Sequence, residues 1–419
     1  MSSAPDTYFR KGFGLKAEVQ DALAADYTGR IVDFLRANDN TLTVGDVTIR
    51  LAREFGFCYG VERAVEYAYQ TRHKFPSPDQ RVILLGEIIH NPHVNARMRE
   101  IGITILGPRP EAPPDEPRFD YSTITPSDVV LLPAFGVTLA DFNALREIGC
   151  IVVDTTCGSV LHVWKRVDSY ARDGLTVLVH GKYYHEETRA TASQVSRYPG
   201  RHYVIVRDMG EADAVCRYIE ALGQGRITLQ ETEAFVARFA KAISPGFDPP
   251  RDLRRIGVAN QTTMLARESL AIGEAVGAAM ARGFGEEYRS ANFRTFDTIC
   301  SATQERQDAV RELLDEPLNA MIVLGGYNSS NTISLAALCA ERVTTFHVES
   351  PEAIDPERRT IAYRVAGVHH EEALATDWLP KNGPVRIGLT AGASTPNNTI
   401  GEVVTRILAT RNLKFEADS

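Results

Sequence analysis

Residues 154–167 read DTTCGSVLHVWKRV, and residues 297–310 read DTICSATQERQDAV. The tetrapeptides DTTC and DTIC are near-copies, and the segment after each cysteine has the pattern of a helix. A third stretch, FGFCYGVERAVEYA at residues 55–68, places Cys58 at the start of a helix in the same way. Helix N-termini lower the pKa of a thiol and favour anionic ligands. The pattern therefore predicts three related units, each with one cysteine at a helix start.

Each of these helices is followed by an apolar strand that ends in a polar loop. The three stretches are RVILLGEIIHNPHV, LTVLVHGKYYHEET and AMIVLGGYNSSNTI, and each unit adds a second strand and turn: VVLLPAFGV, RIGVANQTTM and VRIGLTAGAST. Strands that alternate with helices predict α/β units with parallel sheets, whose ligands bind beyond the carboxyl ends of the strands. We therefore expect three similar α/β domains that direct three thiolates and their polar loops at one centre.

The repeat divides the chain into five predicted segments. Residues 1–44 form an N-terminal extension that is mainly helical, and residues 409–419 form a C-terminal tail. The three α/β units between them are residues 45–156 with Cys58, residues 157–296 with Cys157, and residues 297–408 with Cys300.

The composition is ordinary for a soluble globular protein. The 419 residues carry a net charge of −8 without a long run of Lys or Arg, which argues against nucleic acid as a partner. No apolar run approaches the roughly 18 residues of a membrane span, and the N-terminus lacks the apolar core of a signal peptide. We expect a cytoplasmic protein without a membrane partner, whose six cysteines are thiols, metal ligands or catalysts rather than disulfides.

The other three cysteines have a different context. Cys150, Cys216 and Cys339 lie beside or within apolar strand and helix patterns, as small buried hydrophobic residues do. No CxxC pair is present, so the sequence lacks a zinc-ribbon or ferredoxin-type cluster motif. The alternative to a shared metal site is that the three cysteines at helix starts are unrelated buried residues.

One polar loop offers short donors for an anion. GGYNSSNT places Ser329, Ser330 and Asn331 at a predicted helix start, which is either a phosphate site or a simple N-cap. Ser394 in TAGAST has the same two interpretations.

Two other loops place histidine near the end of a strand. HGKYYHEET contains His185 and Glu187, and HNPHV contains His90. A histidine beside a carboxylate at a strand end indicates proton transfer or anion binding. We expect an extended segment beyond VLVH, on which the adjacent Glu186 and Glu187 point to opposite sides.

Taken together, the motifs resemble those of the 4-hydroxy-3-methylbut-2-enyl diphosphate reductase family. They are GFCYGVERA, EIIHNPHVN, DTTC, HGKYYHEET, NQTTM, DTICSATQERQ, GGYNSSNT and TAGASTP, in this order over roughly residues 46–408. The N-terminal block and the phrase PAFG resemble the cyanobacterial and plastid branch. The resemblance implies three α/β domains in a pseudo-threefold trefoil around a central iron–sulfur cluster. It also implies the last step of the methylerythritol phosphate route, which reduces and dehydrates a diphosphate substrate to isopentenyl and dimethylallyl diphosphates.

The resemblance further implies roles for individual residues. Cys58, Cys157 and Cys300 would hold one 4Fe–4S cluster and leave one iron open, as catalytic metal centres do. Glu187 would be the proton source, and Thr262 would hold the substrate hydroxyl. The diphosphate would lie among His90, His185, Ser329, Asn331 and Ser394, with Ser330 nearby.

Two positions depart from the family pattern. Phe135 stands where many bacterial members have histidine, and Gly158 stands where the family usually has proline.

The implied electron donor is ferredoxin or flavodoxin. A local basic patch would be needed to bind such an acidic partner, and Arg10, Lys11 and Lys16 are the candidates.

Two other functional classes fit part of the pattern. One is an iron–sulfur hydro-lyase that dehydrates its substrate without net reduction, which product analysis with and without a reductant would separate. The other is a non-enzymatic protein, either a scaffold with zinc on three cysteines or an iron–sulfur sensor. The colour of anaerobically purified protein would separate zinc from a brown cluster.

Overall fold

The computed structural model describes residues 7–109, 116–296, 298–367 and 371–415. Asp297 of DTIC and the extreme ends of the predicted extension and tail lie outside the described residues. The chain divides into two compact units. Unit 1 comprises Met1–Lys11, Ser77–Gly86 and Thr104–Cys300, and unit 2 comprises Gly12–Pro76, Glu87–Ile103 and Ser301–Ser419.

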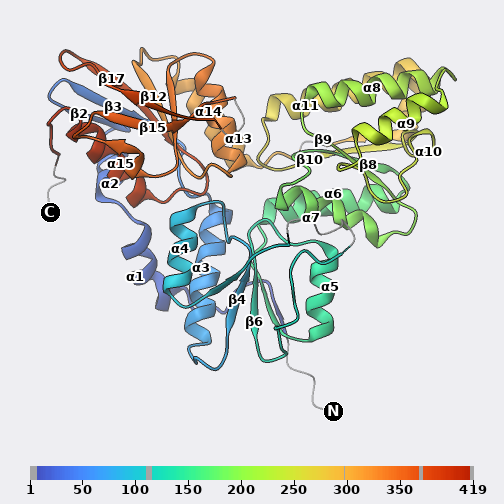
Figure 1. The fold of residues 1–419 in the computed structure, drawn as a ribbon, viewed down its shortest axis with the longest axis horizontal. Helices are drawn as coiled ribbons and strands as arrows, with labels where there is room; N and C mark the ends of the chain where they lie inside the picture. The colour runs from blue at the N-terminus through green and yellow to red at the C-terminus, as the bar shows by residue number, and fades with distance from the viewer. Residues whose placement is uncertain (1–6, 110–115, 297, 368–370, 416–419) are drawn as a thin grey trace. The chain divides into compact units, whose positions relative to one another are not determined.

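Unit 1 contains two parallel sheets (Figure 1). The first has the strand order β1 (Tyr8–Phe9), β7 (Ile151–Asp154), β6 (Val129–Leu132), β4 (Val82–Leu85) and β5 (Thr104–Leu106). The second has the order β11 (Phe293–Thr295), β10 (Ile256–Asn260), β8 (Thr176–His180) and β9 (Tyr203–Val206). Strands β4, β6, β8 and β10 are buried at every residue, which is typical of parallel sheets.

Helices cover both faces of the second sheet (Figure 1). On one face lies α6 (Gly158–Arg172), and on the other lie α8 (Met209–Gly223) and α11 (Ala266–Phe284). A Cβ atom on Gly223 would lie 2.3 Å from the carbonyl carbon of Gly283, so the close approach of α8 to α11 requires glycine. The remaining helices of unit 1 are α5 (Leu139–Ile148), α7 (Glu186–Ser193), η1 (Gln194–Arg197), α9 (Leu229–Arg238), α10 (Pro249–Asp252) and α12 (Glu286–Asn292).

Unit 2 contains one mixed sheet. Its order is β14 (Ile354–Asp355), β15 (Thr360–Arg364), β13 (Thr345–Val348), β12 (Ala320–Leu324), β17 (Val385–Ala391), β3 (Val47–Leu51) and β2 (Thr41–Val44), and β16 (Glu372–Thr376) pairs with β15. The four strands from β13 to β3 are parallel, while the outer strands pair antiparallel.

The central strand β12 shows how helices bury the two faces of this sheet. Met321 and Val323 pack with α13 (Ser301–Leu313) and α14 (Ser330–Ala340) in one core. Ile322 and Leu324 pack with α2 (Arg30–Ala37) and α15 (Asn397–Ala409) in the other. This division follows from the alternation of side chains along a strand. The other helices of unit 2 are α1 (Lys16–Tyr27), α3 (Tyr59–Lys74), α4 (Pro92–Glu100) and η2 (Pro351–Ala353).

The predicted α/β class with parallel strands is confirmed, but strand pairing crosses a predicted segment boundary. Strand β3 opens the predicted segment 45–156, yet it pairs along β17 with Ile49 opposite Ile387. Val47, Ile49 and Leu51 alternate into the core of unit 2, which is the physical reason for this pairing. The boundaries drawn from the repeat stay predictions. Among the described helices, none combines the length and the apolar content that a membrane crossing requires.

Candidate functional site

Glu187 lies on the first turn of α7, just beyond the carboxyl end of β8. Its side chain is 1% exposed, and its Oε1 accepts a hydrogen bond of 2.6 Å from the backbone N–H of Thr262, beyond the end of β10. His185 is the N-cap of α7, where its Nδ1 accepts from the Glu187 N–H at 3.1 Å. The neutral His185 ring therefore carries its proton on Nε2, which is a donor. A buried carboxyl group and an imidazole donor thus lie at one edge of the sheet.

The expectation of an extended segment at this point is wrong. Glu186 and Glu187 are the first two residues of a helix, because His185 caps α7 immediately before them. Their side chains still diverge, since successive residues of a helix point about 100° apart. Glu186 is partly exposed and lies 3.8 Å from Nη1 of Arg118, while Glu187 is buried.

Gln261, which was not predicted from the sequence, joins the two loops around Glu187. Its buried Oε1 accepts from the Thr188 hydroxyl at 3.0 Å and from the Lys182 N–H at 3.2 Å. Its Nε2 donates to the Thr263 hydroxyl at 2.8 Å. The motif NQTT was the available signal, but only the fold shows that its glutamine fixes the loop after β8.

Two of the three predicted cluster cysteines lie in unit 1, beside these loops. Cys157 is the N-cap of α6, and its N–H donates to Ala134 O at 2.9 Å. The Cys300 N–H donates to Thr262 O at 3.3 Å. Cys300 is therefore connected through Thr262 to the carboxyl group of Glu187. Both cysteines are partly exposed.

Phe135, the departure from the family pattern, contacts His185. The two rings meet edge to face, with centroids 5.7 Å apart and planes at 83°. An aromatic ring in this position supports the imidazole by packing, whereas a histidine would add a hydrogen-bonding group.

Cys58 lies in unit 2 as the N-cap of α3. Its N–H donates to Ala393 O at 3.2 Å, in the loop after β17. The preceding turn needs Gly56, which has φ +68°. Arg306 of α13, 3% exposed, donates from Nη2 to Gly56 O at 2.7 Å. Arg306 was not predicted from the sequence, although it stands in the motif DTICSATQERQ.

Five of the predicted diphosphate ligands come together in unit 2. Four of them, Ser329, Ser330, Asn331 and Ser394, are called the cradle below. Asn331 Oδ1 accepts from the Ala393 N–H at 2.9 Å, and the Ser394 hydroxyl donates to His90 O at 3.1 Å. His90 Nδ1 in turn lies 2.8 Å from Glu87 Oε2. The sixth predicted ligand, His185, belongs to unit 1.

The cradle contains buried donors that have no partner among the residues that the structure describes. Ser329 caps α14 by accepting from the Thr332 N–H at 3.3 Å, so the N-cap interpretation holds for this serine. The Ser330 hydroxyl and Asn331 Nδ2 are buried, and among the described residues neither has a hydrogen-bond partner. Buried polar groups are rarely left unpaired. An anion at the start of α14 would satisfy both donors.

His347 holds the loop that leads into the cradle by a hydrogen bond to its backbone. It is 2% exposed, and its Nε2 donates to Gly325 O at 3.0 Å, at the start of the cradle loop. Burial lowers the pKa of His347 to about 4 from its ordinary value of 6.5. The neutral ring is therefore the form that the fold requires.

We expect unit 2 to lose stability as the pH falls from 6.5 to 4. The His347 pKa is lower in the folded protein than in the unfolded chain, so the free energy of unfolding is highest above pH 6.5. As the pH falls, the unfolded chain binds the proton first, which lowers the free energy of unfolding by on the order of 3 kcal/mol. His347→Gln keeps an amide donor for Gly325 but does not titrate, so its free energy of unfolding should depend less steeply on pH. Chemical denaturation from pH 7 to 4 measures this dependence. Equal pH slopes for both proteins would contradict the assignment.

The fold and these loops define an α/β protein with thiols, a buried carboxyl group and the cradle beyond the ends of its parallel strands. The sequence profile of the LytB protein family matches residues 49–408. The chain is 44% identical over 409 residues to 4-hydroxy-3-methylbut-2-enyl diphosphate reductase of Thermosynechococcus vestitus, covering 97% of this chain and 96% of that one. It is 45% identical over 402 residues to the same enzyme of Gloeobacter violaceus, covering 96% and 92%. The chain belongs to the LytB family.

A solved structure shares the fold. The E-1-hydroxy-2-methyl-but-2-enyl-4-diphosphate reductase from Plasmodium falciparum aligns over 86% of this chain and 87% of its own, with a TM-score of 0.59 and 19% identity. The resemblance drawn from the motifs is thereby confirmed at the level of family and fold class.

Proposed function

We propose that the chain catalyses the reductive dehydration of 4-hydroxy-3-methylbut-2-enyl diphosphate to isopentenyl and dimethylallyl diphosphates. This is the last step of the methylerythritol phosphate route to isoprenoids. Relatives at 44% and 45% identity over nearly the whole chain support the proposal. The observation that carries it is the contact series in unit 1 from Cys300 through Thr262 to the buried Glu187. This series supports the proposal that Glu187 is a proton donor close to a cysteine that binds metal.

Cys58, Cys157 and Cys300 are proposed to hold one 4Fe–4S cluster with one iron left open. Soft thiolates are the ligands that such clusters require, and all three residues are cysteines at the starts of helices. Their backbone N–H groups bond to loop carbonyls, so each side chain starts from a fixed loop. When bound, the cluster supplies the electrons and a Lewis-acidic iron.

The cradle is proposed to bind the diphosphate of the substrate. Ser330 and Asn331 provide unpaired donors, and the N-terminus of α14 favours negative charge. Ser329, Ser394, His90 and His185 are assigned to the same role by their motifs.

Glu187 is proposed as the proton source and Thr262 as the residue that holds the substrate hydroxyl. Loss of the hydroxyl as water needs a proton, because hydroxide is a poor leaving group. The Thr262 N–H bond fixes Oε1 of the buried Glu187 side chain. Two electrons and two protons balance the conversion of substrate to product and water.

The proposed electron donor is a ferredoxin or flavodoxin, and the proposed location is the cytoplasm. The three basic candidates for docking are only partly available. Arg10 lies 3.7 Å from Asp154, and Lys16 lies 3.2 Å from Glu66. Because these carboxylates offset two of the charges, Lys11 is the remaining exposed cation of the group.

The test of the function is turnover by anaerobically purified protein. With a chemical reductant and the diphosphate substrate, we expect both isoprenoid diphosphates. Without reductant, we expect no product. Formation of a dehydrated product without reductant would establish the hydro-lyase instead. Colourless protein that contains zinc would overturn the proposal of an iron–sulfur cluster.

The cradle gives a prediction that separates binding from folding. Ser330→Ala removes an unpaired buried hydroxyl, so it should weaken substrate binding by roughly 1.5–3 kcal/mol without loss of stability. Ser329→Ala is the comparison for folding, because it removes the cap of α14 and should lower the free energy of unfolding by about 1 kcal/mol, in addition to the binding loss expected from the role proposed for Ser329. Substrate titration and denaturation of both variants measure this difference. If an analogue without the diphosphate lost equal affinity in Ser330→Ala, the cradle would not be the phosphate site.

A further inference from the structure

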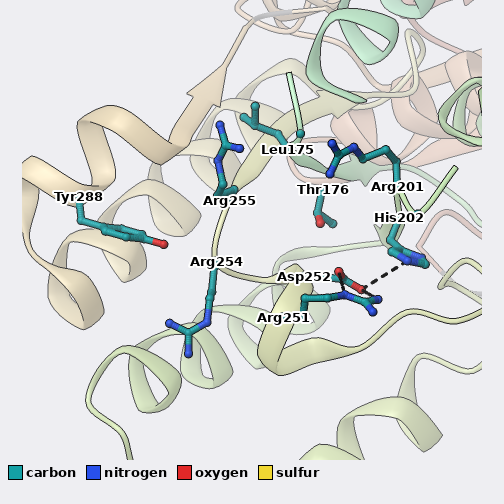
Figure 2. Close-up of a pocket in the computed structure, with 11 residues that line it drawn as sticks. Leu175, Thr176, Arg201, His202, Arg251, Asp252, Arg254, Arg255 and Tyr288 are labelled. Carbon is teal, nitrogen blue, oxygen red and sulfur yellow. Dashed lines mark hydrogen bonds and ion pairs between the residues drawn. The ribbon is translucent and has the colours of Figure 1, made fainter. Parts of the chain in front are cut away.

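A hollow of about 250 Å³ opens at the amino ends of β8, β9 and β10 in unit 1 (Figure 2). Thr176 is the first residue of β8, while His202 and Arg255 directly precede β9 and β10. Glu187 and Thr262 instead follow the carboxyl ends of β8 and β10. The five residues of β8 span about 16 Å. The hollow is therefore a different place from the candidate active site of the same unit.

The lining of the hollow is strongly basic. Arg201, Arg251, Arg254 and Arg255 line it together with one carboxylate, that of Asp252, which leaves a net charge of +3 with histidine neutral. Arg251 holds Asp252 through two hydrogen bonds of 2.7 and 2.8 Å. Among the described residues, the guanidinium groups of Arg201 and Arg255 have neither a hydrogen-bond nor an ion-pair partner.

The two unpaired arginines converge on one point. A Cβ atom on Gly174 would lie 2.9 Å from Arg255 Nη1 and 3.4 Å from Arg201 Nη2. Gly174 has φ +81°, a backbone conformation that favours glycine. Figure 2 shows Thr176 between the two side chains. Its residue is 6% exposed, and no described residue bonds to its hydroxyl.

Two cations that meet without a carboxylate between them repel each other, and a bound anion would remove this repulsion. Guanidinium groups bind phosphate oxygens through paired N–H donors, and the Thr176 hydroxyl adds a third donor at the floor. His202 does not compete, since its Nδ1 lies 3.0 Å from the Ser244 hydroxyl. A hollow of about 250 Å³ has room for a small anion.

We propose that this hollow, which we call the arginine hollow, binds a small anion that carries phosphate, either inorganic or as a phosphate ester. Arg201, Arg255 and Thr176 are its ligands. Arg254 and Tyr288 form the outer wall, where Figure 2 shows the Tyr288 hydroxyl directed toward the arginines.

The test uses inorganic diphosphate as the probe and a local readout. Hydrogen exchange should slow at residues 174–176 and 200–202 when diphosphate is added, in wild-type protein and equally in the cradle variant Ser330→Ala/Asn331→Ala. The double variant Arg201→Gln/Arg255→Gln should raise the diphosphate concentration that gives half of this protection at least tenfold. The matched control is Arg217→Gln, which changes an exposed arginine of α8 outside the hollow. This variant should show the same response to diphosphate as the wild-type protein.

A second variant covers the case in which the double arginine change impairs folding. Thr176→Val keeps the shape of the side chain and should still weaken binding about threefold, since one hydrogen bond is lost. Parallel titrations with inorganic phosphate, glycerol phosphate and sulfate distinguish the sources, and tighter binding of glycerol phosphate than inorganic phosphate indicates an ester. An unchanged response in both hollow variants, or equal weak binding of sulfate and diphosphate, would overturn the proposal. Neither result depends on turnover or on the cluster.

Discussion

Replacement of Cys58, Cys157 or Cys300 by serine is expected to remove most of the iron and nearly all turnover. Each cysteine provides one soft ligand, and a serine hydroxyl does not replace a thiolate at an iron–sulfur cluster. All three stand at helix starts, and the backbone N–H of each donates to the carbonyl group of a loop. Iron content and the visible spectrum of anaerobically purified variants measure the cluster, and reductant-driven turnover measures the activity.

The other three cysteines are matched controls. Cys150, Cys216 and Cys339 are buried, and burial raises the pKa of the first two thiols to about 11 and of the third to about 12. They stay protonated near neutral pH and are not poised to bind metal. Their serine variants should keep full iron with a modest loss of stability. Full iron in Cys157→Ser, or none in Cys216→Ser, would refute the ligand assignment.

The sequence predicted the parts of the fold that depend on local patterns. Apolar runs such as TVLVH and IGVAN are strands, and Cys58 and Cys157 are N-caps of helices, as expected. Local signals are sufficient here because a strand needs only a buried run and a helix start needs only its cap and its first turn.

Pairing between distant segments was beyond such patterns. Strand β3 joins β17, although Ile49 and its partner Ile387 are far apart in the chain. The alternation in VTIRL shows that one face is buried, but it does not show against which strand. The repeat therefore indicated related segments without showing that the first contributes a strand to the sheet of the third.

The same limit applies to the residues that support the site. Gln261 and Arg306 act on backbone groups of other loops, and neither has a sequence signature for this role. Asn331 shows both cases: its place at a helix start was predictable, whereas its bond to the Ala393 N–H required the fold. Chemistry-bearing residues stand out by type and spacing, but the residues that position them are defined by tertiary contacts.

Glu187→Gln is expected to reduce turnover by about 10²–10⁴-fold, which is the usual contribution of general acid catalysis. The amide oxygen of glutamine can still accept from the Thr262 N–H, which the carboxylate does at 2.6 Å. The shape and the hydrogen bond are thus kept, but the amide cannot deliver a proton. Substrate binding should persist, and electron paramagnetic resonance of the reduced protein with substrate checks it.

Glu186→Gln is the adjacent control for this prediction. Glu186 is partly exposed beside Arg118 and does not share the bond to Thr262, so its loss should change turnover by only about a few-fold. Comparison of the two variants at equal iron content separates a lost proton from a lost cluster. Near-normal turnover in Glu187→Gln would reject the acid role, and a severe defect in Glu186→Gln alone would transfer that role to the neighbouring carboxylate.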